Sequence, residues 1–65
     1  MGAMELFDRV RLVTARDDLE AGAIGTIMEV FDRPERAYEV EFSGPDGTTL
    51  TLLTLRPDEV RAVED

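Results

Sequence analysis

The side chains of this sequence that could do chemistry are mainly carboxylates. Glu39 and Glu41 alternate with apolar residues, so both would lie on one exposed face of a strand, where a carboxylate pair could act as acid and base or bind a hard cation. Asp17, Asp18 and Glu20 could bind Ca²⁺ weakly, although they lack the spacing of an EF-hand loop. We favour the simpler interpretation for Glu39 and Glu41, that both are solvated residues of an amphipathic strand.

Most covalent and acid–base mechanisms are excluded by the residue types present. The 65 residues contain no His and no Cys, and all seven basic residues are Arg, so there is no imidazole base, thiolate or Schiff-base amine. Gly22 and Gly25 are too sparse for a phosphate-binding loop and precede a strand instead of a helix. We therefore predict that the chain is not an enzyme, and we predict no catalytic residue, no metal site, no cofactor and no small-molecule substrate.

The charge balance indicates which partners the chain could bind. Fifteen acidic residues give a net charge of −8, which should repel nucleic acids and other phosphate-bearing partners. Binding to RNA would require a clustered arginine face, but the arginines are interleaved with acids along the sequence. The acidity fits a basic protein partner, or simple solubility. The arginines considered for such a face are Arg9, Arg11, Arg33, Arg36, Arg56 and Arg61.

Apolar runs in this chain are short, and we predict no membrane span and no signal peptide, since a spanning helix needs roughly 18 apolar residues. The absence of cysteine fits a reducing compartment, so we expect a cytoplasmic protein. Residues 1–3 look like the remnant of an expression vector ahead of Met4. The predicted organisation is one domain over residues 4–65.

Apolar residues alternate with polar ones nearly everywhere, which predicts strands. The predicted strands cover residues 7–13, 25–31, 38–42, 48–55 and 60–63, separated by a long loop at 17–22, turns at 32–36 and 43–47, and a single helical turn at 57–60. The residues expected to face the core are Val10, Leu12, Ile24, Met28, Val30, Tyr38, Val40 and Phe42, and Gly25 is expected where a neighbouring backbone comes close or the strand bulges.

These elements predict an all-β fold, a small five-stranded SH3-like barrel with a short 3₁₀ turn before the last strand. Closing the sheet on itself would let so few residues build a core and hide the strand edges. The alternative is a three- or four-stranded sheet that a second chain completes.

The fourth predicted strand carries leucines on both faces. Leu53 and Leu55 fall opposite Leu50 and Leu52, and a small barrel has only one interior. A bulge between Leu52 and Leu53 would bury both pairs. Otherwise Leu53 and Leu55 form an exposed apolar strip that marks a protein interface. This candidate interface consists of Leu53, Leu55, Met28, Phe31, Glu39 and Glu41.

Four stretches of this sequence follow the pattern of a known bacterial family, and they lie at residues 5–12, 21–27, 38–42 and 50–55. They make the chain similar to the domain-of-unknown-function family numbered 4926. The first two stretches also resemble SH3-like barrels of the nitrile hydratase β-subunit and ribosomal-protein type. The resemblance implies a small stand-alone bacterial protein, often encoded beside another small reading frame as in toxin–antitoxin or effector–immunity pairs. It implies no catalytic residue, because the family has no established activity.

Two function hypotheses follow. The first is a protein–protein interaction module, the small acidic antitoxin or immunity-like partner of a neighbouring basic protein. The second is a self-associating SH3-like accessory module that forms a homodimer. Substitution of Leu53 by Asp would separate a core role from an interface role.

Overall fold

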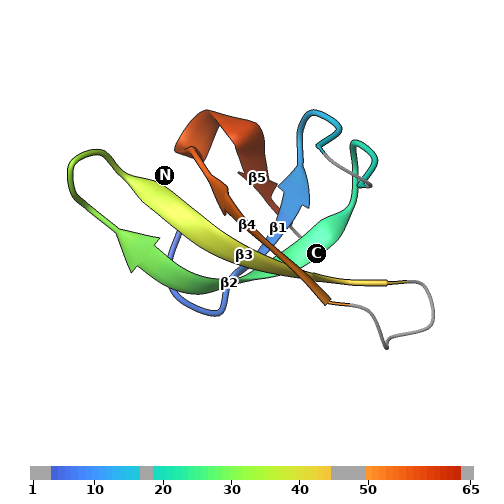
Figure 1. Ribbon diagram of the computed structural model, residues 1–65, viewed down its shortest axis with the longest axis horizontal. Helices are drawn as coiled ribbons and strands as arrows, with labels where there is room; N and C mark the ends of the chain where they lie inside the picture. Colours follow the sequence, from blue (N-terminus) through green and yellow to red (C-terminus); the bar gives the residue numbers. More distant parts are fainter. Residues whose placement is uncertain (1–3, 17–18, 45–49, 64–65) are drawn as a thin grey trace.

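The computed structural model describes residues 4–16, 19–44 and 50–63, without the side chain of Leu50 (Figure 1). It confirms the predicted all-β class with five strands and one short 3₁₀ turn. The elements are β1 (Arg9–Leu12), β2 (Ile24–Phe31), β3 (Ala37–Ser43), β4 (Leu50–Leu55), η1 (Pro57–Glu59) and β5 (Val60–Ala62). The predicted turn at 43–47 and the predicted start of the fourth strand at 48–49 lie mostly outside the described residues, as do Asp17 and Asp18.

The five strands form one antiparallel sheet in the order β4-β3-β2-β1-β5. The sheet curves, and η1 carries the chain from β4 at one edge to β5 at the other (Figure 1). It is not closed: among the described residues no ladder joins β4 to β5. No helix in the described part of the chain is long and apolar enough to cross a membrane.

One apolar core lies on the concave side of this sheet, and every strand contributes to it. The predicted inward alternation of β1 and β3 is confirmed, because each second residue of these strands is buried. The buried residues are Val10, Leu12, Ile27, Tyr38, Val40, Phe42, Leu55 and Val60. Leu19, in the predicted loop that precedes β2, packs against this core.

A β-bulge at Met28 changes which residues of β2 face inward. Ile27 pairs with Val40 and Glu29 pairs with Glu39, so Met28 is the extra residue between them. Inward positions are Gly25 and Ile27 before the bulge and Val30 after it. The predicted inward position of Met28 is therefore wrong, and so is that of Ile24, which is also exposed.

Gly25 confirms the expected close approach of a neighbouring backbone. A Cβ atom at this position would lie 2.8 Å from the carbonyl oxygen of Glu41 and 2.7 Å from Cγ1 of Val40. The absence of a side chain thus lets β2 and β3 pack together at the point where Phe42 enters the core.

The 3₁₀ turn η1 is held by Glu59. Its Oε1 accepts a hydrogen bond from the backbone N–H of Arg56 at 2.7 Å, and its Oε2 pairs with the guanidinium of Arg16 at 2.7 Å. Pro57 at the first position fits the start of a helical turn, where no N–H is needed. Glu59 therefore ties the turn before β5 to the segment that follows β1.

Candidate functional site

Leu53 and Leu55 do not form the exposed strip proposed for them. Leu55 is fully buried and Leu53 packs against the core. They lie opposite Tyr38 and Val40 in the β3–β4 ladder, and residues directly opposite each other in a sheet share a face. The ladder runs without interruption, so the alternative of a bulge between Leu52 and Leu53 is wrong as well. Among the leucines of β4 whose side chains the structure describes, Leu52 faces solvent and is 55% exposed.

The convex side of β2, β3 and β4, which we call the outer face, brings the other predicted interface residues together. Met28 and Phe31 from β2 are exposed, Glu39 and Glu41 of β3 are half-buried, and Leu52 comes from β4. The sequence thus predicted four members of this face and placed the wrong leucines on it. It also missed Glu29, which the bulge turns outward opposite Glu39.

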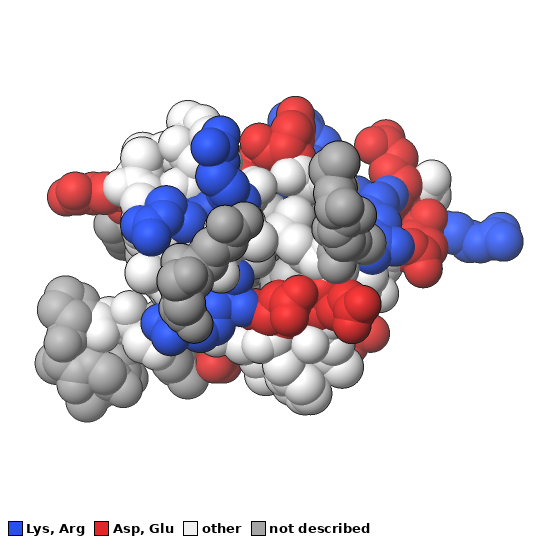
Figure 2. Space-filling view, turned by 180° about the vertical axis from the view of Figure 1, so that it is seen from behind, with Lys and Arg blue, Asp and Glu red and all other residues white. Residues whose placement is uncertain are grey.

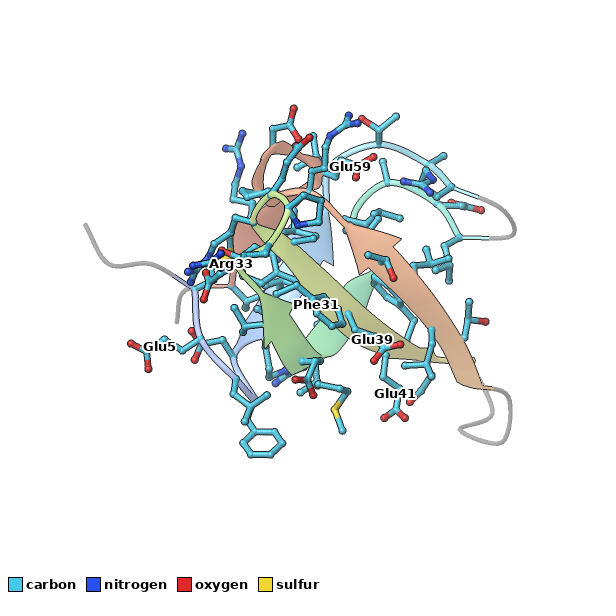
Figure 3. All side chains as sticks on the ribbon, turned by 60° about the vertical axis from the view of Figure 1, so that its left-hand side comes forward. Glu5, Phe31, Arg33, Glu39, Glu41 and Glu59 are labelled. Atoms are coloured by element: carbon cyan, nitrogen blue, oxygen red, sulfur yellow. The ribbon has the colours of Figure 1, made fainter. Side chains whose placement is uncertain are left out.

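Three carboxylates form the centre of the outer face. Glu29 and Glu39 are direct cross-strand partners. Glu41 follows Glu39 on the same side of β3, as Figure 3 shows. Like charges directly opposite each other in a sheet repel. None of the ion pairs formed among the described residues involves these three carboxylates. A cationic group from another molecule would therefore relieve their repulsion.

Apolar side chains surround these carboxylates. Met28 is 37% exposed and Phe31 is 38% exposed. A hollow of about 360 Å³ lies beside Phe31 at the edge of the outer face, and its walls include the arginines Arg33, Arg36 and Arg56. Interface side chains that become fully desolvated in a pocket contribute most to binding, so Phe31 beside this hollow is a candidate anchor for a partner.

Phe7 is a further exposed apolar residue beside this face, although its sequence neighbourhood predicts a place in the first strand. The strand begins only at Arg9, and Phe7 lies in a turn with φ 72° and 66% of its surface exposed. Its N–H donates to the carbonyl of Ile27 at 2.7 Å, which holds it next to the bulged Met28. A left-handed conformation is uncommon for an aromatic residue, and it costs about 1–2 kcal/mol.

No group of three or more His, Cys, Asp or Glu within residues 4–16, 19–44 and 50–63 is arranged to hold a metal ion. No buried side-chain nitrogen or oxygen atom in that part of the chain lacks a hydrogen-bond partner. What the outer face offers is apolar contact area and negative charge.

The family model for a domain of unknown function, DUF4926, matches residues 6–62. The chain belongs to the DUF4926 family. The match spans all five strands and η1, so it covers both the core and the outer face. Neither a curated protein nor a solved structure matches this DUF4926 chain.

Proposed function

We propose that this protein is a non-enzymatic protein–protein interaction module of the cytoplasm that binds a basic partner through the outer face. The observation that supports the proposal most directly is the position of Glu29, Glu39 and Glu41 among Met28, Phe31 and Leu52. Apolar groups in an interface supply affinity, and charges beside them select the partner and speed association.

The carboxylate arrangement favours a cationic partner. Burying Glu29 against Glu39 without a counter-charge would be costly, whereas a Lys or Arg placed between them would interact with both. A net charge of −8 adds long-range attraction for a basic protein. An antitoxin or immunity-like role, in which the protein neutralises a basic neighbour, is the form of this function that we propose.

A second candidate is self-association. The same chain carries the acidic outer face and, on β1 and β5, three exposed arginines at positions 9, 11 and 61. One copy could therefore place its outer face on the arginines of another. Light scattering from micromolar to millimolar concentration tests this candidate, which requires a mass that rises with concentration and falls when Glu39 is replaced by Lys.

The test of the main proposal combines capture and calorimetry. The tagged protein is used to capture a basic protein from its native host, and the purified pair is titrated. We expect Leu52→Asp, Glu39→Lys and Phe7→Gly each to weaken binding at least tenfold. Glycine at position 7 removes the ring and tolerates the positive φ, so the fold is kept.

Two controls separate folding from binding. Glu20→Lys changes the charge equally at an exposed site away from the outer face and should leave affinity within twofold. Leu53→Asp places a charge against the core and should unfold the protein, whereas Leu52→Asp should not. Equal loss of affinity in Glu20→Lys and Glu39→Lys would show that net charge alone drives association and would overturn the proposed face.

A further inference from the structure

Seen from behind, the molecule carries basic side chains on both sides of the view, interspersed with acidic ones (Figure 2). In the sheet, Arg11 of β1 and Arg61 of β5 are direct cross-strand partners. Arg9 lies one alternation away on β1, and all three side chains are exposed on the side of the strands opposite the core residues Val10 and Leu12. Pairing of β1 with β5 thus creates an arginine cluster that the linear sequence does not show.

These arginines differ from others in the chain. Arg16, Arg36 and Arg56 each lie within 4.0 Å of an aspartate or glutamate oxygen. Within the described part of the chain no such pair is found for Arg9, Arg11 or Arg61, nor for Arg33, which lies apart from them in the 32–36 turn. Two like charges directly opposite each other in a sheet are unfavourable, and an anion between Arg11 and Arg61 would remove that repulsion.

A cavity of about 390 Å³ lies between these two arginines and the chain that leads into β2. Its other walls are formed by Leu12, Val13, Ala21 and Gly22. Gly22 has φ 95°, and no atom lies within 4 Å of the position that a Cβ would occupy there. The N–H of Gly22 donates to the carbonyl of Leu12 at 2.7 Å, so this wall is fixed to β1.

The charge and size of the cavity determine the ligand class. Two guanidinium groups match the charge of a phosphate monoester, about −1.5 to −2 near neutral pH, and each can donate two parallel hydrogen bonds to it. The volume is within the usual range of small-molecule sites, about 300–1,000 Å³. A net charge of −8 repels long polyanions far more than a single phosphate group.

We propose that Arg11 and Arg61, with the cavity beside Gly22, form a binding site for a small organic phosphate monoester. The phosphate lies between the two guanidinium groups, and its organic part packs against Val13 and Ala21. This site is on β1 and β5, so it is separate from the outer face of β2, β3 and β4 and does not depend on the function proposed for that face.

The test uses the full chain labelled with ¹⁵N, titrated with phenyl phosphate at constant ionic strength. We expect saturable one-to-one binding with shifts centred on Arg11, Arg61 and Gly22, and an affinity for phenyl phosphate at least threefold above that for inorganic phosphate. Arg11→Gln and Arg61→Gln should each weaken binding about tenfold or more. Arg33→Gln, which makes the same charge change in the 32–36 turn, should change the affinity for phenyl phosphate less than twofold.

Further measurements keep the test decisive. Arg61→Lys retains the charge but loses the forked donor pair, so binding should fall between that of the natural chain and Arg61→Gln. Affinity should drop as the pH falls from about 7.5 to 5.5, because phosphate loses its second charge near pH 6 while arginine stays protonated. Non-saturable shifts, equal loss in Arg33→Gln, or tighter binding of single-stranded oligonucleotides with increasing length would each overturn the proposal.

Discussion

Gly25 shows how one missing side chain determines the contact between two strands. A Cβ there would lie 2.8 Å from the carbonyl oxygen of Glu41 and 2.8 Å from Cδ1 of Phe42. The carbonyl oxygen belongs to a paired strand and cannot move without disturbing the ladder, and Phe42 is among the fully buried side chains of the core. No rotamer change can relieve both contacts.

We therefore expect Gly25→Ala to lower the free energy of unfolding by about 1–3 kcal/mol. Urea denaturation followed by circular dichroism measures this change. Thr26→Ala, at the next position and on the other side of β2, is the control and should change the free energy by less than about 1 kcal/mol. A Gly25→Ala variant as stable as the control would mean that β2 and β3 can separate at this point without cost.

Phe7 is the residue whose role was least accessible from the sequence. Its apolar neighbours and aromatic side chain favour a strand, and no local signal such as glycine or asparagine marks the positive φ that it adopts. The turn is closed locally, because the N–H of Asp8 donates to the carbonyl of Glu5 at 3.0 Å and Oδ2 of Asp8 accepts from the N–H of Glu5 at 2.9 Å. Tertiary contacts add to this, since Phe7 and Asp8 each share a backbone hydrogen bond with Ile27. The role of Gly25, by contrast, was predicted correctly, because glycine inside a strand pattern usually marks a bulge or the close approach of another backbone.

At the scale of elements, β2 and β4 show the limit of prediction from period-two patterns. The elements themselves were predicted because strand residues and turn residues alternate clearly. The pattern of β4, with leucines on both faces, does not say which face is inside, and the answer comes from its register with β3. Leu53 and Leu55 were therefore assigned to the exposed side of their strand although they face the core.

The turn η1 depends on one side chain for its position. Glu59 accepts from the N–H of Arg56 and pairs with Arg16, a residue that is distant in sequence. Its side chain is 21% exposed, so the pair is only partly screened by solvent. We expect Glu59→Ala to cost about 1–2 kcal/mol in the free energy of unfolding, because it removes both the cap and the ion pair.

Glu59→Gln separates the two contributions in the same urea experiment. The amide oxygen can still accept from Arg56, so this variant should lose less than half of what Glu59→Ala loses. Asp58→Ala, which alters an exposed carboxylate of the same turn, is the control. Identical losses for Glu59→Ala and Glu59→Gln would show that the cap contributes nothing and that the ion pair with Arg16 holds the turn.

For the whole molecule, the net charge of −8 on 65 residues opposes folding through repulsion among the carboxylates. Salt screens this repulsion, and it also weakens exposed ion pairs such as Arg36 with Asp32. Because exposed pairs contribute about 1 kcal/mol or less each, the first effect should dominate. We expect the melting temperature to rise between about 0.05 and 0.5 M NaCl.

Scanning calorimetry at several salt concentrations measures this effect. Glu59→Gln lacks the partly buried ion pair with Arg16. Its melting temperature should rise more with salt than that of the natural chain, because salt has one attractive ion pair fewer to weaken. A melting temperature that falls with salt in both proteins would mean that the ion pairs outweigh the repulsion.

The carboxylates on β2 and β3 and the arginines on β1 and β5 lie on different parts of the sheet and form a local electric dipole. In the field of a cationic protein, this dipole produces a torque that turns the outer face toward the approaching surface before contact. Encounters then begin in a productive orientation more often than a random rotational search allows. The distribution of charge over the sheet thus acts on the rate of association as well as on the stability of the complex.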